Sequence, residues 1–412
     1  MNPHHHLFGL PTWIPISLLG LISWTAWLVR QYVGAGYNPL VNEHRETTSI
    51  IVPVFREDIE VLKTCLDTWL ANGPEEIILE IDFSETAIIE HAVQWAQHEP
   101  RIRSIIAHKP GKRHALALGI KAAKFDVVVL SDSDTVWTGE FLANLLMGFG
   151  DPLVAGVGCR QNVYQPGNSI WRRVADWMLD VRFLHFIPAT ARYGSVPCIS
   201  GRTAAYRREI VTPMLEDLEG ETYFGRQCIS GDDGRLTWLI LRDGWKAGYQ
   251  SSAKALTVFP NNFSGFAKQR VRWSRNSYRC YSRAIGRGWL WRQPVITSVS
   301  VLQNLLGPFT LTLVTSLLIA AVLQGEWIVA FVTTVWLLIG RSIKGIGHLV
   351  REPETIVYLP LITIVFIAIM IPIKFYALFT LNHQGWITRT QGNSVASGQG
   401  SDTLDLPSST FE

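Results

Sequence analysis

The sequence predicts an α/β domain built on a parallel sheet, in a chain that also enters a membrane. Short apolar segments alternate with helix-like segments between residues 48 and 131. This order is typical of a parallel, doubly wound sheet with right-handed crossovers. Apolar stretches without charge lie on both sides of this region, and the longer ones can span a bilayer. The fold class is therefore α/β with additional α-helical membrane segments.

The elements of the α/β region follow from its hydrophobic periodicity. The segment 57–72 has helical spacing and ends at Asn72-Gly73-Pro74, a turn sequence. Strands are predicted at 49–54, 76–82, 102–108 and 126–131, and helices at 57–72, 85–98, 112–124 and 234–242.

The first apolar stretch, residues 7–29, carries no charge. Arg30, Arg45 and Arg56 follow it, so the positive-inside rule places the next segment in the cytoplasm. A cleaved signal peptide is the alternative. Its basic leading region and its small-residue cleavage site are both missing, so we expect a membrane helix.

Three further apolar runs follow Arg292, at residues 294–323, 327–340 and 356–379. A basic loop with Arg341, Lys344 and Arg351 separates the last two runs and is expected on the cytoplasmic side. The tail from Gln391 is rich in Ser, Gly and Thr, and we predict that it is disordered.

The composition excludes several classes of protein. Of the 412 residues 48% are apolar and 17% are charged, which is too apolar for an ordinary soluble protein. The net charge is only +3, and the basic residues between 268 and 292 are interpreted as facing a membrane surface and a diphosphate, so no nucleic-acid partner is expected. The 5 cysteines have no metal or disulfide spacing, which fits a reducing cytoplasm.

The segment Ser131-Asp132-Ser133-Asp134-Thr135 directly follows an apolar strand. Ligands of open α/β sheets bind outside the carboxyl ends of the strands. Alternate side chains of an extended segment point the same way, so Asp132 and Asp134 can hold one hard divalent cation between them. The ordinary alternative is a strand that ends in an Asp/Ser turn.

Other strand ends carry groups that suit a nucleotide. Phe55 follows the first strand and can stack on a base, and Asp82 ends the second strand, where it can accept hydrogen bonds from a uracil or a ribose. Lys112 and Arg113 open the third helix, a favourable place for a diphosphate. Each residue alone has an ordinary structural interpretation, but together they favour a nucleotide site.

Two later motifs carry candidate chemistry. Asp232 and Asp233 precede the helix at 234–242, where one can cap the helix while the other acts as a base. Gln269, Arg272 and Trp273 share one face of a helix, because they are spaced i, i+3 and i+4. That face suits a sugar, and an amphipathic helix lying on a membrane is the alternative or additional interpretation.

With these motifs the chain, from about Ser49 to Arg389, resembles the membrane-embedded family 2 glycosyltransferases. It is most similar to the processive polysaccharide synthases, which include hyaluronan synthase, chitin-oligosaccharide synthase and type 3 capsule polysaccharide synthase. The segments that carry the resemblance are Ile81-Asp82, Gly111-Lys112-Arg113, Asp132-Ser133-Asp134-Thr135-Val136-Trp137, Ser200-Gly201-Arg202, Gly231-Asp232-Asp233, the Gln-x-x-Arg-Trp at 269–273 and Trp386-Ile387-Thr388-Arg389.

The resemblance implies a GT-A fold, a Rossmann-like α/β domain with a mixed, mostly parallel sheet. It also implies an inverting, processive enzyme in the plasma (inner) membrane, with a cytoplasmic catalytic domain. The enzyme would use Mg²⁺ or Mn²⁺ to polymerise UDP-sugars onto a growing polysaccharide, which leaves through its membrane segments as an extracellular or capsular polymer.

The resemblance also implies a role for each motif residue. Asp82 would contact the uridine, Lys112 the diphosphate, and Asp132 and Asp134 the nucleotide and the metal. Asp233 would be the general base, with Asp232 beside it. The acceptor site would consist of Gln269, Arg272 and Trp273, and the loop from Trp386 to Arg389 would close over the donor, with Arg389 on its diphosphate.

The chain departs from the family pattern at two places. Ile387 stands where Gly is usual in hyaluronan synthases, and Phe83-Ser84 follows Asp82 where Gly-Asn is frequent.

A cytoplasmic loop at 386–389 requires an even number of membrane crossings after the domain, but three apolar runs follow it. Pro360 and Pro372 interrupt the last apolar run, so we predict that 356–380 is a broken interfacial or re-entrant segment.

The domain prediction and the alternative functions complete these expectations. One alternative is the transfer of a single sugar to a lipid acceptor, and one of another class is a membrane transporter with a nucleotide-sensing domain. The predicted boundaries are 1–40 for the first membrane helix, 41–265 for the glycosyltransferase domain, 266–293 for the amphipathic helix, 294–380 for the membrane segments, 381–390 for the gating loop and 391–412 for the tail.

Overall fold

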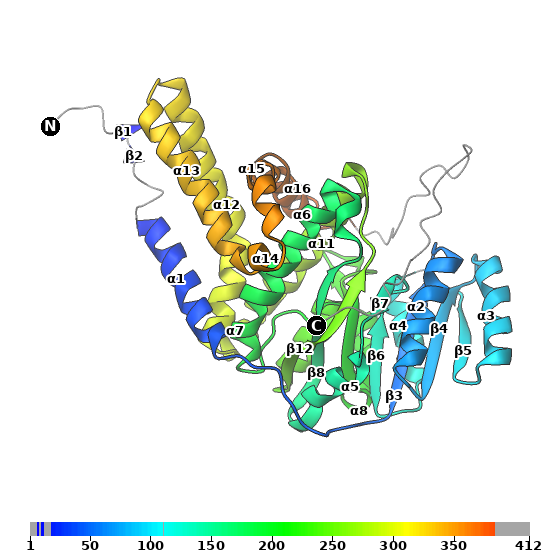
Figure 1. Ribbon diagram of the computed structural model, residues 1–412. Coiled ribbons are helices and arrows are strands. Elements are labelled where there is room, and N and C mark those ends of the chain that lie inside the picture. Colours follow the sequence, from blue (N-terminus) through cyan, green and yellow to red (C-terminus); the bar gives the residue numbers. More distant parts are fainter. Residues whose placement is uncertain (1–5, 8–9, 12–17, 110, 384–412) are drawn as a thin grey trace, which may run out of the picture. The chain divides into compact units, whose positions relative to one another are not determined.

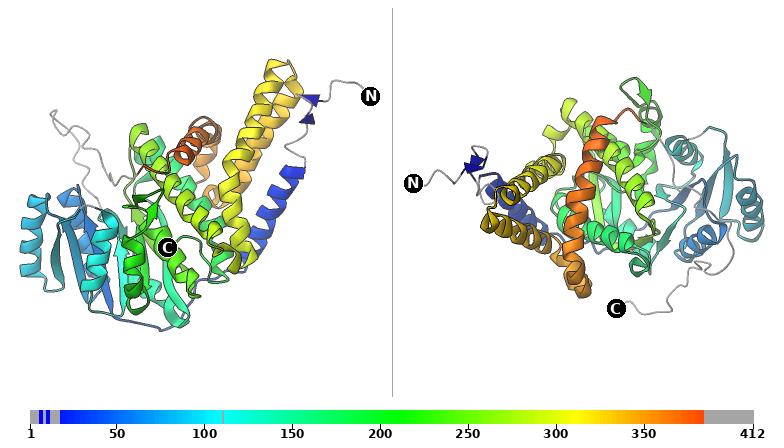
Figure 2. Two further views of the ribbon diagram at one scale, coloured as in Figure 1. Left: turned by 180° about the vertical axis from the view of Figure 1, so that it is seen from behind. Right: turned by 90° about the horizontal axis from the view of Figure 1, so that it is seen from above.

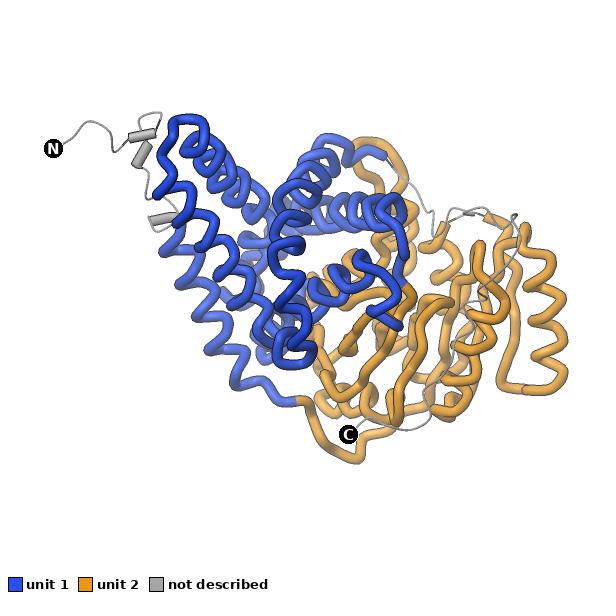
Figure 3. Tube along the Cα trace, turned by 45° about the horizontal axis from the view of Figure 1, so that its top comes forward, with its two compact units in different colours: residues 1–38, 165–197, 259–383 blue, residues 39–164, 198–258, 384–412 orange. Residues whose placement is uncertain are grey.

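The computed structural model describes residues 6–7, 10–11, 18–109 and 111–383. The chain divides into two compact units (Figure 3), with residues 1–38, 165–197 and 259–383 in unit 1 and residues 39–164, 198–258 and 384–412 in unit 2. This division differs from the predicted domain at 41–265, since the segment 165–197 and the residues after 258 belong to unit 1. The segment 165–197 belongs there because its helices pack on other helices of that unit.

Unit 2 is built on an eight-stranded sheet of order β5-β4-β3-β6-β9-β8-β12-β7 (Figure 1). Four of the neighbouring pairs are parallel and three are antiparallel, which confirms the mixed, mostly parallel sheet. The strands are β3 (Thr48–Val54), β4 (Glu76–Asp82), β5 (Ile102–Ala107), β6 (Val127–Ser131), β7 (Thr135–Trp137), β8 (Val154–Val163), β9 (Thr203–Arg207) and β12 (Lys246–Thr257).

Three helices cross between the parallel strands, as the sequence predicts: α2 (Ile59–Ala71), α3 (Thr86–His98) and α4 (Lys112–Ala122). Side chains of α2 and α3 share one apolar core with Ile50 and Leu79. The helix α4 packs on the other face, where Gly119 approaches Ile51 and Glu80. Neighbouring residues of a strand point to opposite faces, so this arrangement follows from the parallel order.

The local sequence explains where these elements begin and end. Asp58 caps α2 by accepting hydrogen bonds from the backbone N–H groups of Glu60 and Val61. After α2 the chain turns at Gly73, whose φ of +70° few other residues adopt. The strands β3, β4 and β6 are buried along their whole length, as expected of strands covered on both faces.

The rest of unit 2 surrounds the antiparallel part of the sheet. The helix α10 (Asp232–Arg242) begins two residues earlier than the predicted helix at 234–242. A short hairpin of β10 (Thr222–Tyr223) and β11 (Arg226–Gln227) precedes it. The remaining helices are α5 (Phe141–Leu146), α8 (Arg208–Val211) and α9 (Leu215–Glu219), with 3₁₀ turns at Met147–Gly150 and Thr212–Met214.

Unit 1 contains the membrane helices. Within the described part of the chain, three helical segments are long and apolar enough to cross a membrane: α12 (Val295–Leu323), α13 (Trp327–Lys344) and the run Pro353–Phe379. The helices α12 and α13 lie side by side (Figures 1 and 2). The predicted first span overlaps α1 (Leu18–Ala35), which contains Arg30 and is not among the three, and it begins partly outside the described residues.

The last apolar run corrects one expectation. We predicted that Pro360 and Pro372 would break it, but residues 353–379 are helical throughout. The run consists of a 3₁₀ segment (Pro353–Tyr358), α15 (Leu359–Ile364), a π-helical segment (Val365–Met370) and α16 (Ile371–Phe379). Each proline lies in the first turn after a change of helix type, where its missing N–H and its ring are tolerated.

The other elements of unit 1 connect these helices. The longest is the predicted amphipathic helix, α11 (Phe263–Gly286). The remaining elements are β1 (His6–Leu7), β2 (Leu10–Pro11), α6 (Ile170–Asp180), a π-helical segment (Val181–Phe186), α7 (Ile187–Ala191), α14 (Ile346–Arg351) and 3₁₀ turns at Pro166–Asn168 and Leu290–Arg292.

Candidate active site

Three distant segments of unit 2 meet at Lys112, the first residue of α4. Its Nζ lies 2.6 Å from Oδ1 of Asp132, which follows β6, and 3.5 Å from Oδ2 of Asp232, which opens α10. The sequence predicted all three residues as site residues, and the fold brings them together. A cation between two carboxylates at the carboxyl ends of parallel strands is a suitable place for a diphosphate and its counter-charges.

The charge of Lys112 is secured by its neighbours. Burial by itself lowers the pKa of the Lys112 ammonium, but the carboxylates of Asp132, Asp232 and Asp233 more than offset this effect, so the pKa lies above its ordinary value. Lys112 therefore stays charged at physiological pH, although its side chain is only 14% exposed.

The Asp-Ser-Asp segment is held in place by backbone and side-chain bonds. The N–H of Asp132 donates to the carbonyl of Arg202 at 2.9 Å, and Oγ of Ser133 donates to Glu57 at 2.7 Å. The indole of Trp69 donates to the carbonyl of Thr135 at 2.9 Å. Both ends of the turn are fixed, so the carboxylates of Asp132 and Asp134 extend from a rigid support.

The pair Asp132 and Asp134 fits the requirements of a divalent cation. Both residues are partly exposed at the end of β6, and both offer the carboxylate oxygens that Mg²⁺ and Mn²⁺ prefer. Lys112 contacts only Oδ1 of Asp132, so the second oxygen of that carboxylate can still bind a cation.

Asp232 and Asp233 open α10 but differ in their surroundings. The chain enters α10 through Gly231, whose φ is +77°. Asp232 is buried at 5% exposure and pairs with Lys112, whereas Asp233 is partly exposed. Oδ1 of Asp233 accepts the N–H of Gly234 at 2.8 Å, and its Oδ2 lies 3.7 Å from the thiol of Cys198. No cation among the described residues lies within 4 Å of Asp233, so of the two neighbouring aspartates only Asp232 forms an ion pair there.

The Ser-Gly-Arg motif at 200–202 provides the wall behind these carboxylates. A Cβ atom on Gly201 would lie 3.1 Å from Oδ2 of Asp232 and 3.1 Å from Cβ of Asp233, and 3.5 Å from Nζ of Lys112. The motif thus needs glycine for close approach rather than for an unusual φ. This reason was not apparent from the sequence.

The nucleoside end of the predicted site lies at the ends of β3, β4 and β5. Asp82 is buried, and its Oδ1 accepts two hydrogen bonds from Ser84, at 3.0 Å from N and 2.6 Å from Oγ. Ser84 therefore orients the carboxylate. The exposed ring of Phe83 stacks on His108 with centroids 6.4 Å apart, and the guanidinium of Arg56 covers the ring of Phe55 at 5.0 Å.

Arg113 has different surroundings from those expected. We predicted a diphosphate contact, but its side chain is 5% exposed and donates to the carbonyls of Leu218, Ser230 and Gly231. Its guanidinium thus contacts the chain that leads into α10, whereas Lys112 contacts the carboxylates. Consecutive residues of a helix point in directions about 100° apart, which explains the difference.

The predicted sugar-binding face lies on α11 in unit 1. Gln269, Arg272 and Trp273 are all partly exposed on this helix. The guanidinium of Arg270 lies 4.4 Å from the centre of the Trp273 ring and donates to Oε1 of Gln269 at 3.1 Å. The sequence analysis missed Arg270, although its i, i+3 spacing to Trp273 was a usable signal. Trp386 and Arg389 lie outside the described residues.

A second group of potential metal ligands lies in unit 1. Asp176, Asp180 and His348 are buried, with ligand atoms within 4.8 Å of one another. Arg351 donates to both carboxylates, and Nδ1 of His348 lies 2.8 Å from Asp180. The guanidinium already provides a positive charge to this group, so its geometry is that of a buried ion-pair network that holds α14 to α6.

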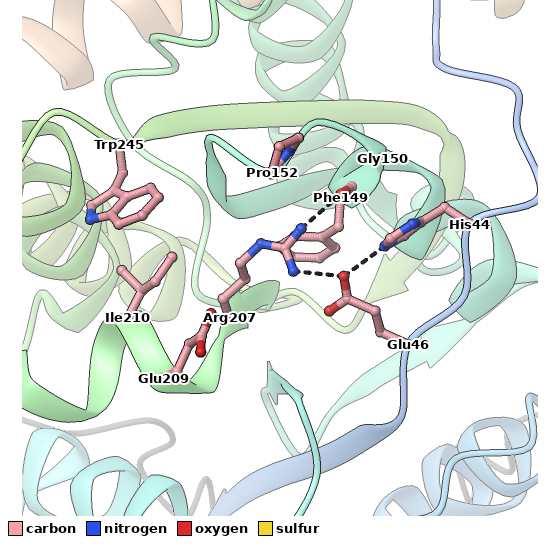
Figure 4. Close-up of a pocket in the computed structure, with 9 residues that line it drawn as sticks. All are labelled: His44, Glu46, Phe149, Gly150, Pro152, Arg207, Glu209, Ile210 and Trp245. Carbon is pink, nitrogen blue, oxygen red and sulfur yellow. Dashed lines mark hydrogen bonds and ion pairs between the residues drawn. The ribbon is translucent and has the colours of Figure 1, made fainter.

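A cavity of about 250 Å³ lies in unit 2 where β8 and β12 begin and β9 ends (Figure 4). There Arg207, the last residue of β9, bonds to Glu46 at 2.6 Å and to the carbonyl of Phe149 at 2.8 Å. None of the predicted site residues lines this cavity, which is formed by His44, Glu46, Phe149, Gly150, Pro152, Arg207, Glu209, Ile210 and Trp245.

The mixed sheet, the carboxylates at its strand ends and the apolar helices are the features of a GT-A-like α/β enzyme with candidate membrane helices. The chain belongs to the family described as glycosyltransferase-like family 2, which matches residues 44–276, more than half of its length. This membership confirms the family that the sequence motifs resemble.

The relatives agree with this assignment. The chain is 26% identical to a hyaluronan synthase of Streptococcus pyogenes over 393 residues, which cover 93% of this chain and 92% of that protein. It is 29% identical to an N-acetylglucosaminyltransferase of Azorhizobium caulinodans over 347 residues, 82% of this chain and 86% of that protein. A mannosyltransferase of Pyrobaculum calidifontis, solved with GDP-Man and Mn²⁺, shares the fold with a TM-score of 0.60 and 21% identity, over 85% of this chain and 96% of that one.

Proposed function

We propose that this protein is an inverting, processive glycosyltransferase that polymerises UDP-sugars and moves the polymer through its own membrane segments. The observation that carries the proposal is the meeting of Lys112, Asp132 and Asp232 at the carboxyl ends of the parallel strands, with the partly exposed Asp233 beside them. This arrangement places a diphosphate-binding cation next to a potential base, and an inverting transfer requires both.

In the proposed reaction Asp233 removes the proton of an acceptor hydroxyl. The hydroxyl oxygen forms a bond with the anomeric carbon of the donor sugar, while the bond from that carbon to the diphosphate breaks. UDP leaves with the electron pair of the broken bond, and the proton stays on Asp233. One displacement inverts the anomeric centre, so no covalent sugar–enzyme intermediate and no second nucleophile are needed.

The other residues of the site bind and orient the donor. Asp82 and Phe55 hold the uridine, and Lys112 balances the charge that develops on the departing diphosphate. Mg²⁺ or Mn²⁺, held by Asp132 and Asp134, would supply further positive charge at the diphosphate. Arg389 and Trp386 close over the donor, and Gln269, Arg272 and Trp273 bind the acceptor sugar.

Polymer export distinguishes this proposal from the transfer of one sugar to a lipid. The three candidate spans and the similarity to hyaluronan synthase over most of both chains support export. The catalytic unit then lies in the cytoplasm of a cell whose plasma (inner) membrane is crossed by α12 and α13. The run 353–379 stays on the cytoplasmic side as an interfacial or re-entrant segment, because a cytoplasmic loop at 386–389 requires an even number of crossings after the domain. We propose the same functional regions as the sequence predicts, with boundaries at 41–265, 266–293, 294–380, 381–390 and 391–412.

The test is UDP release by the purified full-length protein in detergent. UDP-N-acetylglucosamine is the first donor to try, because one relative is named for that sugar. UDP-glucuronate, UDP-glucose and UDP-galactose follow, singly and in pairs. We expect release with at least one donor or pair, together with a high-molecular-mass product. Release with only a one-sugar lipid product would favour the single-transfer alternative, and no release with any donor would overturn the proposal.

The same assay tests the metal. Excess EDTA should stop UDP release, and added Mg²⁺ or Mn²⁺ should restore it. Unchanged turnover in EDTA would exclude the proposed role of Asp132 and Asp134 in holding a cation.

A further inference from the structure

Arg113 is a buried cation that the proposed reaction does not use. Its Nε donates to the carbonyl of Ser230 at 3.1 Å, its Nη1 to that of Leu218 at 3.0 Å and its Nη2 to that of Gly231 at 3.1 Å. Its Nη1 also lies 2.7 Å from Oε2 of Glu221. The planar fork of a guanidinium is suited to this kind of multiple contact, which a lysine ammonium cannot reproduce.

The partner of Arg113 is held from a second side. Oε1 of Glu221, a residue only 9% exposed, lies 3.5 Å from Nη1 of Arg235 on α10. The Nε and Nη2 atoms of Arg235 bond to the carbonyl of Asp217 at 3.2 and 3.0 Å. Glu221 therefore lies between two arginines, and the segment 217–231 is fastened to both α4 and α10.

Other side chains of α4 support the same segment. His114 contacts Glu219 at 2.7 Å, and Nζ of Lys121 lies 3.6 Å from the same carboxylate. The segment ends at Ser230-Gly231, directly before Asp232 and Asp233. Two of the three carbonyls that Arg113 binds, those of Ser230 and Gly231, are thus the last two before Asp232 and Asp233. Gly231 itself has a φ of +77°.

We propose that Arg113 is a positioning residue that holds the turn before α10, and through it Asp233, in the geometry of the transfer reaction. This inference rests on the proposed function, because it assigns the base role to Asp233. It also assigns different roles to Lys112 and Arg113, the first two residues of α4. Lys112 binds the diphosphate side of the site, and Arg113 places the base relative to it, so the same helix sets both positions.

The physical reason is the cost of an unpaired carbonyl in a buried turn. Without the guanidinium, the carbonyls of Leu218, Ser230 and Gly231 lose their side-chain partner, and the turn shifts to find water or other donors. Asp82 and Lys112 lie on β4 and α4, and Asp132 directly follows β6, so these donor contacts do not depend on this turn. Asp232 follows the turn, but its contact with Lys112, at 3.5 Å, is longer than that of Asp132 at 2.6 Å. The base therefore moves, whereas most of the donor site stays in place.

The variant that tests this is Arg113→Lys in the full-length protein. It keeps the positive charge beside Glu221 and loses the fork. We expect kcat of UDP release to fall between about 10-fold and 100-fold, because a misplacement near 1 Å can cost about 10²-fold. The KM for the UDP-sugar and the Kd for UDP should stay within about twofold of the wild-type values.

A double-mutant cycle shows whether Arg113 acts through Asp233. In an Asp233→Asn background the base is absent, so Arg113→Lys should cause no further loss of the residual transfer. Glu221→Gln is the second variant, useful if Arg113→Lys does not fold. It keeps the shape of the carboxyl group but loses its charge, and should lower kcat in the same direction by a smaller factor, again with UDP binding intact.

The matched control is Arg103→Lys. Arg103 also pairs with a glutamate, Glu76 at 2.8 Å, and donates to a backbone carbonyl, that of Ala122 at the other end of α4. It loses the same kinds of bond away from the site, so wild-type kcat is expected, and thermal melting compares the folds of all variants.

The outcomes are distinct. If wild-type protein releases no UDP, the proposed function itself fails. If it does release UDP, equal losses in kcat and in UDP affinity for Arg113→Lys would indicate that Arg113 contacts the diphosphate. That result would overturn the positioning role. Unchanged kcat, or a further full loss in the Asp233→Asn background, would overturn it as well.

Discussion

At the scale of single residues, the candidate site consists of carboxylates arranged around the ammonium group of Lys112. Lys112 contacts Asp132 and Asp232 directly, while the donors to Asp233 within residues 18–109 and 111–383 are neutral, namely the N–H of Gly234 and the thiol of Cys198. Asp232 and Asp233 can therefore have different roles, although they are consecutive residues of the same type. The structure separates them by burial and by partner.

The first prediction concerns Asp233→Asn. Binding of the UDP-sugar should stay nearly intact, and turnover should fall by about 10²–10⁴-fold, the usual contribution of a general base. Calorimetry with UDP and UDP-release kinetics measure the two quantities. Asp232→Asn is the comparison, and because Asp232 pairs with Lys112 it should weaken UDP binding instead. Wild-type turnover in Asp233→Asn would exclude the base assignment.

Gly201→Ala tests the wall of the site. The new Cβ would lie 3.1 Å from Oδ2 of Asp232 and from Cβ of Asp233, closer than atoms normally pack. We expect a fall of at least about tenfold in turnover, equivalent to about 1.4 kcal/mol, with a folded protein. The control is Gly286→Ala, where nothing lies within 4 Å of the added atom. Equal activity of the two variants would show that the site tolerates the methyl group.

At the scale of elements, the packing of α4 on β4 encloses an unusual carboxyl group. Glu80 is 1% exposed, neither of its oxygens has a hydrogen-bond partner among the described residues, and Gly119 of α4 packs against it. Burial raises the pKa of Glu80 to about 8, against the weaker opposing effect of Arg103. The carboxyl is therefore largely protonated at neutral pH.

This burial makes the stability of unit 2 depend on pH. The ordinary pKa of 4.5 applies to the unfolded chain and about 8 to the folded one, so between these values only the unfolded chain releases the proton. The stability that Glu80 contributes is thus complete below about pH 4.5 and is lost as the pH rises through about 8.

Glu80→Gln should remove this dependence. The amide is neutral at every pH, so the melting temperature of the variant minus that of the wild type should increase from pH 5.5 to pH 8.5. Each kcal/mol corresponds to about 2–4 °C for a unit of this size. Melting curves in detergent at the two pH values measure it. A difference that does not change with pH would mean that Glu80 titrates normally.

The helix α11 carries the fourth prediction. Arg270 covers the Trp273 ring on one side at 4.4 Å, which holds the indole in one orientation. If Trp273 is the platform for the acceptor sugar, Trp273→Ala should abolish polymer formation while UDP still binds, and slow hydrolysis of the UDP-sugar can remain. Gel filtration of radiolabelled product and UDP calorimetry measure the two. Long polymer from a folded Trp273→Ala protein would leave the indole with a membrane-anchoring role only.

At the scale of the whole molecule, the three candidate spans set the topology. A short exposed turn, Gln324–Glu326, joins α12 to α13, and the basic segment with Arg341, Lys344 and Arg351 follows α13. The positive-inside rule predicts that the basic segment lies in the cytoplasm and, as a consequence, that the turn lies on the outer side.

Cysteine labelling tests this topology in intact cells. Gln324→Cys should react with a membrane-impermeant maleimide from outside, whereas Glu354→Cys and the partly exposed native Cys198 and Cys280 should react only after the cells are opened. Both introduced positions are exposed, so accessibility depends on the side of the membrane. Labelling of Glu354→Cys in intact cells would invert the proposed orientation.

The order of the elements could be predicted from the sequence, because each is encoded locally. Short apolar runs and helical spacing indicated β3 to β6 and their crossover helices within one or two residues. The apolar runs indicated α12, α13 and the last membrane helix. Lys112 and Asp132 could also be placed together in advance, since the carboxyl ends of parallel strands meet at one end of the sheet. The contact of Asp232 with Lys112 became apparent only in the structure.

Only the tertiary structure decided which contacts adjacent residues make, and therefore which roles they can have. The sequence places Lys112 beside Arg113 and Asp232 beside Asp233, but the direction of each side chain depends on which elements pack on its helix. Likewise, the continuity of residues 353–379 depends on a π-helical segment that accommodates Pro372. Local patterns determine the elements, whereas burial, partners and side-chain direction arise from contacts between residues about 100 positions apart, such as Arg113 with Glu221.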